Sequence, residues 1–243
     1  TSGSYNFKLA AKAKNMPSAA AEFQQKRLNV WINATAPCLS LDGWRAGQST
    51  WTLEDMTHES CYVGIDLASK IDLATLSLAF PPTVGRRAWR VYNFIWTPEA
   101  TLTERAHRDR APYDVWADQG WLLTCPGTRI DQNLIKAKLL ELRTLVDIER
   151  VGFDPWHADK LIDELVAEGF TAEQVLAVPQ TYQGMSSGCL EMQAEILGGH
   201  VDARGCPVTR WAGSNAVGQS DGKQNLMFAK GKSRGRIDPV VAP

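Results

Sequence analysis

The stretch Cys61-Tyr62-Val63-Gly64-Ile65-Asp66 decides the fold, because it is a short apolar run that ends in an acid. Apolar runs of this length are typical of buried strands. Two further runs follow at short intervals: Leu73–Phe80, which stops at Pro81-Pro82, and Ala88–Trp96, in which apolar and polar residues alternate. Three successive strands with short connections predict an antiparallel meander that begins at Cys61.

Beyond residue 100 the pattern changes to helices separated by single strands. The predicted elements are a helical segment over 103–119 broken at Pro112, a strand over 121–125, a helix over 131–150, a strand over 151–154, a helix over 157–168, a strand over 175–179 and a helix over 189–197. The helix over 131–150 has the clearest apolar stripe, and Asp131 is its expected N-cap. This element order is that of the ribonuclease-H-like fold. We therefore expect an α/β protein with a mixed β-sheet, an antiparallel meander plus parallel strands, flanked by helices.

The two ends of the chain differ from this body. Residues 17–33 are predicted to form a helix, and the irregular stretch up to about residue 60, rich in Gly and Trp (Trp44, Trp51), is expected to pack as an arm on the main body. The alternative is that this Trp-rich arm is exposed. A hairpin is expected around Ser220–Lys223. We divide the chain into an N-terminal arm or linker over 1–58 and a ribonuclease-H-like domain over 59–243. We also expect the chain to be a fragment of a longer protein.

The composition excludes several classes of protein. With 44% hydrophobic and 22% charged residues among 243, the chain is neither disordered nor collagen-like nor a coiled coil. Its formal net charge of −1 does not favour a uniformly basic nucleic-acid binder. The charge is unevenly distributed, however: +4 over residues 1–50, −9 over 51–200 and +4 over 201–243. Basic ends flanking an acidic middle indicate charged partners.

Cysteine spacing and hydropathy bear on the cellular compartment. The five cysteines are widely spread and form no C-x-x-C pair, which disfavours a zinc site and favours a reduced, cytosolic protein. No run approaches the ~20 apolar residues of a membrane span, and we expect no membrane partner. No P-loop spacing is present either, so ATP binding is not expected.

Three acids stand at element boundaries that this fold would bring together. Asp66 ends the first strand, Asp154 ends the strand over 151–154, and Asp238 begins the last predicted helix. Carboxylates repel each other when clustered, so three on adjacent elements favour a site for a hard divalent cation such as Mg²⁺ or Mn²⁺. Two such ions roughly 4 Å apart support in-line phosphoryl displacement. Each acid taken alone is more commonly a turn former or helix cap.

Two further residues are candidates for auxiliary roles. Asp72 follows Asp66 by six residues and could be an additional metal ligand, although a turn explains it equally well. His157 follows Asp154 by three and could assist a metal-bound water, whereas a solvated helix start is its ordinary role.

A basic segment immediately precedes Asp238. It consists of Lys223, Lys230, Lys232, Arg234 and Arg236. Cations beside a metal site would bind a phosphate backbone without contacting bases, in a salt-dependent manner. A solvated loop is the alternative interpretation. We therefore predict these five residues as DNA-binding.

In these motifs the sequence resembles the nuclease domain of the large subunit of tailed-phage terminases. The matching segments are Cys61–Ala68 with Asp72–Ala74, Tyr113–Trp116, Gly120–Leu122, Pro126-Gly127, Phe153–Ala158 and Lys232–Ala242, with Leu28–Trp31 upstream. As an ordered set these segments are specific, although the Gly64-Ile65-Asp66 strand alone is not.

The resemblance implies a function. It implies a Mg²⁺- or Mn²⁺-dependent endonuclease that cleaves concatemeric double-stranded viral DNA, with Asp66, Asp154 and Asp238 as the acidic triad and two bound ions. It further implies an ATPase part upstream of residues 1–58, the portal and the small terminase subunit as partners, and the host cytoplasm as the location.

Two alternatives remain open at this point. The chain could be a non-catalytic ribonuclease-H-like module that docks on DNA or the portal. It could also be another enzyme of the same fold, such as a resolvase or an integrase. Mn²⁺ binding tests the first alternative, and substrate preference tests the second.

Overall fold

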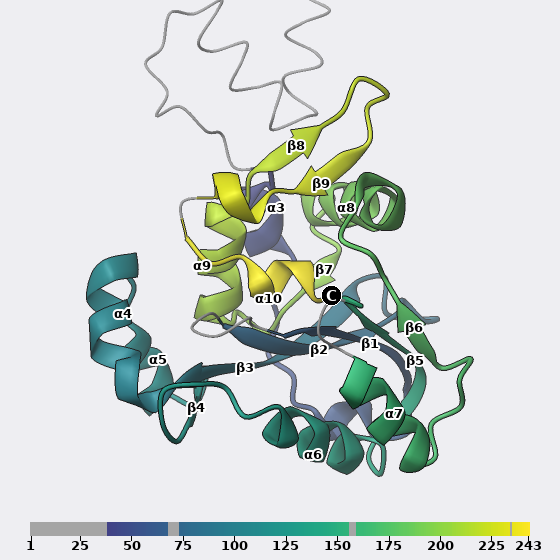
Figure 1. The fold of residues 1–243 in the computed structure, drawn as a ribbon. Helices are drawn as coiled ribbons and strands as arrows, with labels where there is room; N and C mark the ends of the chain where they lie inside the picture. The colour runs from purple at the N-terminus through teal and green to yellow at the C-terminus, as the bar shows by residue number, and fades with distance from the viewer. Residues whose placement is uncertain (1–37, 68–72, 156–158, 234) are drawn as a thin grey trace, which may run out of the picture.

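A seven-stranded sheet with helices on both faces forms the centre of the molecule (Figure 1). The computed structural model describes residues 38–67, 73–155, 159–233 and 235–243. The helix predicted over 17–33 and three candidate site residues, Asp72, His157 and Arg234, lie outside the described residues.

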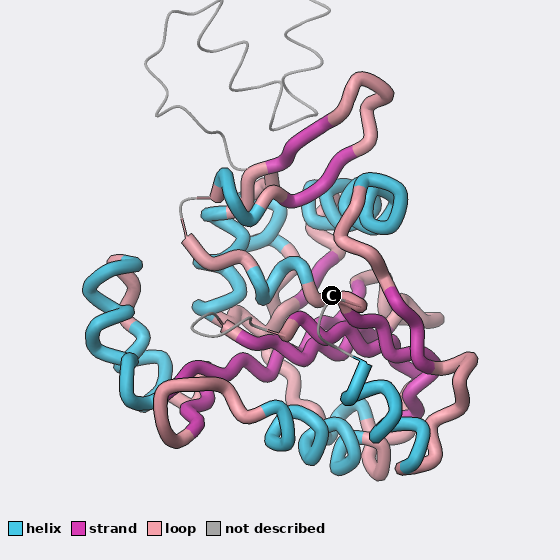
Figure 2. The backbone as a smooth tube through the Cα atoms, in the orientation of Figure 1, coloured by secondary structure: helices cyan, strands magenta, loops and turns pink. Residues whose placement is uncertain are grey.

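The sheet combines antiparallel and parallel pairs. Strands β1 (Ser60–Asp66), β2 (Ala74–Phe80) and β3 (Trp89–Pro98) form an antiparallel meander. The parallel pairs involve β5 (Asp147–Phe153) on β1, β6 (Val175–Ala177) on β5, and β4 (Leu123–Cys125) and β7 (Val201–Asp202) on β3. The order β4-β3-β2-β1-β5-β6 confirms the predicted mixed sheet, whose strands are drawn in magenta in Figure 2.

Side chains along β1 point alternately to the two faces of the sheet and so lie in two different layers. Cys61, Val63 and Ile65 are buried in one core together with residues of α6 (Gln132–Leu142) and α7 (Asp159–Ala167). Successive strand residues point to opposite faces, so Gly64 and Asp66 face the other layer. Asp66 is therefore directed away from the α6 and α7 side of the sheet.

The second layer is built from later parts of the chain. It contains α3 (Leu41–Ala46), α8 (Tyr182–Leu197), α9 (Pro207–Asn215), α10 (Asp238–Val241) and the hairpin of β8 (Gly218–Ser220) and β9 (Leu226–Phe228) (Figure 1). Residues of α3, α8, α9 and α10 share one hydrophobic core. Helices α4 (Leu102–Asp109) and α5 (Tyr113–Asp118) pack at the β3–β4 end of the sheet. The hairpin and the break at Pro112 were both predicted.

The long helix predicted over 131–150 is wrong. Helix α6 ends at Leu142, and Asp147–Phe153 is strand β5. Val146 and Ile148 are buried in the core under β1, and β5 pairs with β1 along its length. Pairing with a distant strand thus outweighs the local helical pattern.

Helix α8 begins at Tyr182, earlier than the predicted start at residue 189. The Thr181 side chain caps it by accepting a hydrogen bond from the Gly184 amide. Gly184 and Gly188 lower helix propensity and hid this first part from the sequence pattern. The short elements α3, α9 and β7 are not among the elements predicted from the sequence.

For the described residues, the tryptophan-rich stretch packs on the body as expected, and the alternative of an exposed arm is wrong. Trp44 is 2% exposed and Trp51 is 5% exposed. Trp44 lies in the core shared by α3 and α8, while Trp51 packs against Phe80 and Tyr92. Residues 38–58 are thus part of the packed body. The assignment of 1–58 to an upstream part of a longer protein stays a prediction.

The five cysteines are buried, and their thiols are free. Burial raises the pKa of Cys38 and Cys61 to about 12, so these thiols are protonated and poor nucleophiles at neutral pH. Within the ranges that the structure describes, no helix has the length and apolar character needed to cross a bilayer.

A close backbone approach seats the C-terminal segment on the sheet. A Cβ atom placed on Gly64 would lie 1.6 Å from the carbonyl oxygen of Ala242, far inside van der Waals contact. Only glycine at this position allows the segment after α10 to cross β1. The chain terminus accordingly lies against the middle of the sheet (Figure 1).

We predict that Gly64→Ala lowers the free energy of unfolding by about 1–3 kcal/mol, because the added methyl group forces the C-terminal segment off β1. Urea denaturation of both proteins measures the change. Gly188→Ala is the matched control: its Cβ would meet nothing within 4 Å, so it should be neutral or stabilising. Equal stability of Gly64→Ala and the parent chain would contradict the close approach.

Candidate active site

Two carboxylates from opposite ends of the described chain meet in the layer above β1. Asp66 is the last residue of β1 and is 3% exposed. Asp238 is the first residue of α10 and is 2% exposed. Burial of this kind is costly for an ionised carboxylate unless a cation or a hydrogen-bond donor accompanies it.

Lys230 supplies that cation. Its Nζ atom lies 2.6 Å from Asp66 Oδ2 and 2.9 Å from Asp238 Oδ1, so one ammonium bridges both acids. Lys230 begins the short 3₁₀ helix η3 (Lys230–Lys232), directly after the hairpin strand β9. The hairpin, β1 and α10 together therefore build the centre of the site.

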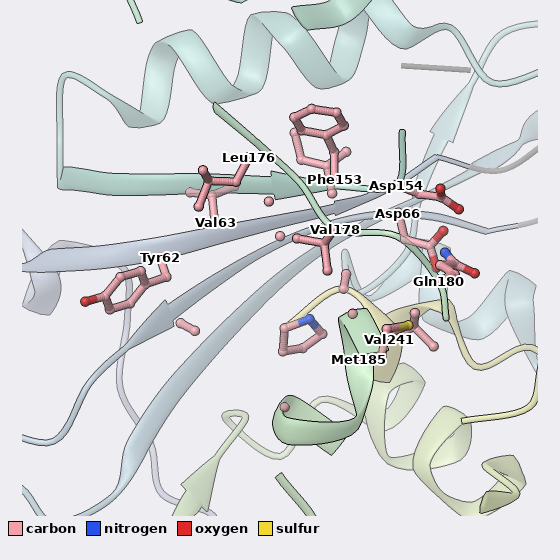
Figure 3. A pocket seen from close by; sticks show the side chains of 18 of the residues that line it. Tyr62, Val63, Asp66, Phe153, Asp154, Leu176, Val178, Gln180, Met185 and Val241 are labelled. Carbon is pink, nitrogen blue, oxygen red and sulfur yellow. The ribbon is translucent and has the colours of Figure 1, made fainter. Parts of the chain in front are cut away.

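Asp154 is the third acid. It follows β5, the parallel neighbour of β1, so its position at the strand end corresponds to that of Asp66. Both residues line one pocket, and Figure 3 shows them side by side at one end of it. The charge of Asp154 contributes to raising the pKa of Asp66, which places the two carboxylates within electrostatic reach.

The electrostatics of the site favour bound positive charge. Burial raises the pKa of Asp66 and of Asp238, and the Lys230 ammonium opposes this rise. The charge of Asp154 adds to the rise at Asp66, and the charge of Asp66 adds to the rise at Asp238. Burial disfavours the charged form of Lys230, but the two carboxylates outweigh this effect and raise the lysine pKa. The three raised pKa values have one consequence: Asp66 and Asp238 retain a cation or a proton between them.

The adjoining pocket has a volume of about 400 Å³ and is mostly apolar away from the acids. Gly64 and Gly152, which are register partners on β1 and β5, leave its sheet side without bulky side chains. Tyr62 lies at the end of the pocket away from Asp66 and Asp154 (Figure 3). Met185 and Val241 line the pocket on the side nearer the acids. The acids therefore lie at one end of the pocket, and Arg150, the register partner of Tyr62, is part of its lining as well.

The chemistry of the donors fits a hard divalent cation. Buried carboxylate oxygens are the ligands that Mg²⁺ and Mn²⁺ prefer, and two of them already converge on a cation. Among the described residues, no group of three or more His, Cys, Asp or Glu side chains is arranged to hold a metal ion. The ammonium of Lys230 occupies the position between Asp66 and Asp238 instead.

The structure separates the predicted DNA-binding residues into different environments. Lys223 lies in the loop of the β8–β9 hairpin and Lys232 lies at the end of η3, and both are exposed. Arg236 lies 3.6 Å from Asp109 of α4 and ties the C-terminal segment to that helix. Lys230 binds the acids. Lys223 and Lys232 are thus exposed, whereas Lys230, whose side chain is 38% exposed, forms ion pairs with both acids.

Two buried hydroxyl groups beside the acids were not predicted. Thr75 is the register partner of Asp66, Ser77 is the partner of Gly64, and neither is exposed. Their hydroxyl oxygen atoms have no hydrogen-bond partner among the described residues. Polar residues at alternate positions of an otherwise apolar strand are the signal that would have identified them.

Comparison with known proteins places this geometry in a family. The family model for the terminase large subunit, endonuclease domain, matches residues 6–243. The terminase large subunit of Enterobacteria phage HK97 is 33% identical over 233 residues, which is 96% of this chain and 45% of that protein. Protein YmfN of Escherichia coli strain K12 is 25% identical over 243 residues, covering 95% of this chain and 52% of that protein.

A solved structure agrees with this assignment. The crystal structure of the HK97 bacteriophage large terminase matches with a TM-score of 0.76 and 32% identity, covering 97% of this chain and 48% of that one. The chain spans about half the length of the curated relatives it matches. These matches support neither the resolvase nor the integrase alternative. The mixed sheet is of the expected ribonuclease-H-like kind, and the chain belongs to the family of terminase large subunit endonuclease domains.

Proposed function

We propose that this chain is a divalent-metal-dependent endonuclease that hydrolyses phosphodiester bonds of concatemeric double-stranded DNA during viral genome packaging. The observation that carries the proposal is the convergence of Asp66 and Asp238 on one cation, with Asp154 at the end of the neighbouring strand. Membership in the terminase endonuclease family supports it.

Asp66, Asp154 and Asp238 are the residues that would hold Mg²⁺ or Mn²⁺. Two bound ions, as the sequence predicts, would supply an activated water and charge stabilisation at the leaving oxygen. Asp66 and Asp238 are positioned by β1 and by the α10 segment packed on Gly64, so their carboxylates have little freedom to reorient. The low exposure of both residues excludes bulk water, which strengthens electrostatic interactions within the site.

The exposed lysines are suited to the DNA backbone. Lys223 and Lys232 lie on the hairpin loop and η3, and η3 also carries Lys230 into the acid cluster. Contacts from such side chains orient a duplex without reading its sequence. Lys232 is separated from Lys230 by one residue, so its charge would lie near the proposed site of cleavage, where it could bind a phosphate.

The packaging context extends the proposal beyond this chain. We infer that an ATPase part precedes residues 1–58 in the full-length protein and that the portal and the small terminase subunit are its partners. The site of action would be the cytoplasm of the infected cell. Asp72 and His157, which lie outside the described residues, stay candidate auxiliary groups.

A non-catalytic docking module is the second candidate function. The Lys230 bridge favours it, because a lysine that permanently neutralised Asp66 and Asp238 would leave no place for a metal ion. Titration of the chain with Mn²⁺ in a calorimeter separates the two candidates. Binding supports the nuclease, and no binding by a folded protein supports the module.

We predict that Asp66→Asn reduces cleavage of supercoiled plasmid in Mn²⁺ by about a hundredfold or more, because it removes a charged ligand from the centre of the site. Gel electrophoresis of the nicked and linear products measures the rate. Circular dichroism establishes that the variant is folded. Chelation with EDTA should abolish cleavage by the parent chain, and added Mn²⁺ should restore it.

Asp118→Asn is the matched control for this experiment, since Asp118 is an exposed acid at the end of α5, remote from the β1 site. It should cleave at the rate of the parent chain. Undiminished cutting by Asp66→Asn would end the proposal.

A second prediction concerns Lys232. Lys232→Ala should weaken binding to duplexes of any sequence and reduce the slope of log affinity against log salt concentration by about 1, because one phosphate contact is lost. Fluorescence anisotropy with labelled duplexes over a range of salt concentrations measures both quantities. An unchanged slope would place Lys232 outside the DNA interface. Lys136→Ala, in an ion pair with Glu164, is a control that should leave the slope unchanged.

A further inference from the structure

Lys230 occupies the position at which the two buried acids meet. Its ammonium contacts Asp66 Oδ2 at 2.6 Å and Asp238 Oδ1 at 2.9 Å. A divalent cation held by these acids would use carboxylate oxygens of the same kind as ligands. The ammonium and a divalent ion therefore cannot hold these two oxygen atoms at the same time.

The two acids need a cation or a proton to offset their repulsion. Asp66 is 3% exposed and Asp238 is 2% exposed, so water screens their repulsion poorly. Removing one partner of a buried charge cluster leaves the others uncompensated, which is strongly destabilising. Lys230 thus has a structural role before any metal ion arrives.

The lysine side chain can leave without a backbone rearrangement. Its side chain is 38% exposed, unlike those of the acids, so part of its length is open to solvent. The backbone on either side is held: the Ala229 amide donates to Val217 O at 2.8 Å, and the Lys232 amide donates to Ala229 O at 3.1 Å. Rotation of the flexible four-carbon stem is sufficient to move the charge.

We propose that Lys230 is an internal counter-ion that exchanges with the metal. It neutralises Asp66 and Asp238 until a divalent cation binds, and its ammonium then moves out of the acid pair. The inference rests on the proposed function, because it concerns the same metal site. The exchange lowers metal affinity, and it frees a positive charge beside the acids where a DNA phosphate would lie.

The central test is Lys230→Met, which keeps the length of the side chain and removes its charge. We expect the Kd for Mn²⁺, measured by calorimetry, to fall by about tenfold or more, because no ammonium has to be displaced. In EDTA the same variant should unfold at a lower temperature than the parent chain. A purely structural ion pair predicts the loss of stability with an unchanged or larger Kd.

Lys136→Met is the matched control. Lys136 forms a comparable ion pair, 2.7 Å from Glu164, between α6 and α7 on the other face of the sheet. Its loss should leave the Kd for Mn²⁺ unchanged. Lys230→Arg keeps the charge and should not tighten Mn²⁺ binding.

The possible outcomes separate the two proposals. Equal Kd values for the parent chain and folded Lys230→Met overturn the exchange and leave the proposed metal site intact. Absence of Mn²⁺ binding to both folded proteins overturns the metal site and the exchange together.

A labelling experiment on the parent chain tests the exchange without any variant. Acetylation by an N-hydroxysuccinimide ester requires an accessible, deprotonated amine, and the ion pairs protect Lys230. Saturating Mn²⁺ should increase acetylation of Lys230 severalfold and leave that of Lys136 unchanged, as quantified by mass spectrometry of peptides. Unchanged labelling of Lys230 in Mn²⁺ at concentrations shown to bind would overturn the exchange.

Discussion

The repulsion between two almost fully buried carboxylates constrains how the layer of α3, α8, α9, α10 and the β8–β9 hairpin is built on the sheet. Asp66 and Asp238 are each almost fully buried, and the Lys230 ammonium between them makes their proximity tolerable. Three elements, β1, α10 and η3, must therefore converge with an accuracy of a few tenths of an ångström. The close contact over Gly64 provides part of that accuracy, because it fixes the segment that carries Asp238 against the sheet.

The sequence predicts those parts of the fold that depend on local pattern. The meander from β1 to β3, the break at Pro112 and the β8–β9 hairpin follow from short apolar runs and turn residues. The boundary between α6 and β5 does not, because Val146 and Ile148 extend the helical stripe and reveal their strand only through pairing with β1. Burial of Trp44 and Trp51 likewise depends on distant partners and is invisible in their Gly-rich surroundings.

The same distinction between local pattern and tertiary contact applies to the candidate site. The convergence of Asp66 and Asp154 could be inferred because acids at the ends of parallel neighbouring strands meet at one edge of a sheet. The separate roles of Lys230 and Lys232 could not be inferred. Both belong to one basic segment, yet one turns into the acid cluster and the other faces solvent, as the geometry of η3 dictates. Composition identifies a basic segment, whereas only tertiary structure distinguishes a lysine paired with buried acids from one that faces solvent.

The order in which the chain is made gives the Lys230 bridge a further consequence. Asp66 and Lys230 are 164 residues apart, and Asp238 comes later still. During synthesis from the N-terminus, β1 and its acid emerge first and can pair with β2 and β3 while the rest of the cluster has yet to be made. Contacts of such long sequence range also form late in folding. The acid–lysine cluster accordingly forms after the sheet, so a chain whose synthesis has not yet reached Lys230 carries β1 with Asp66 still without its lysine partner.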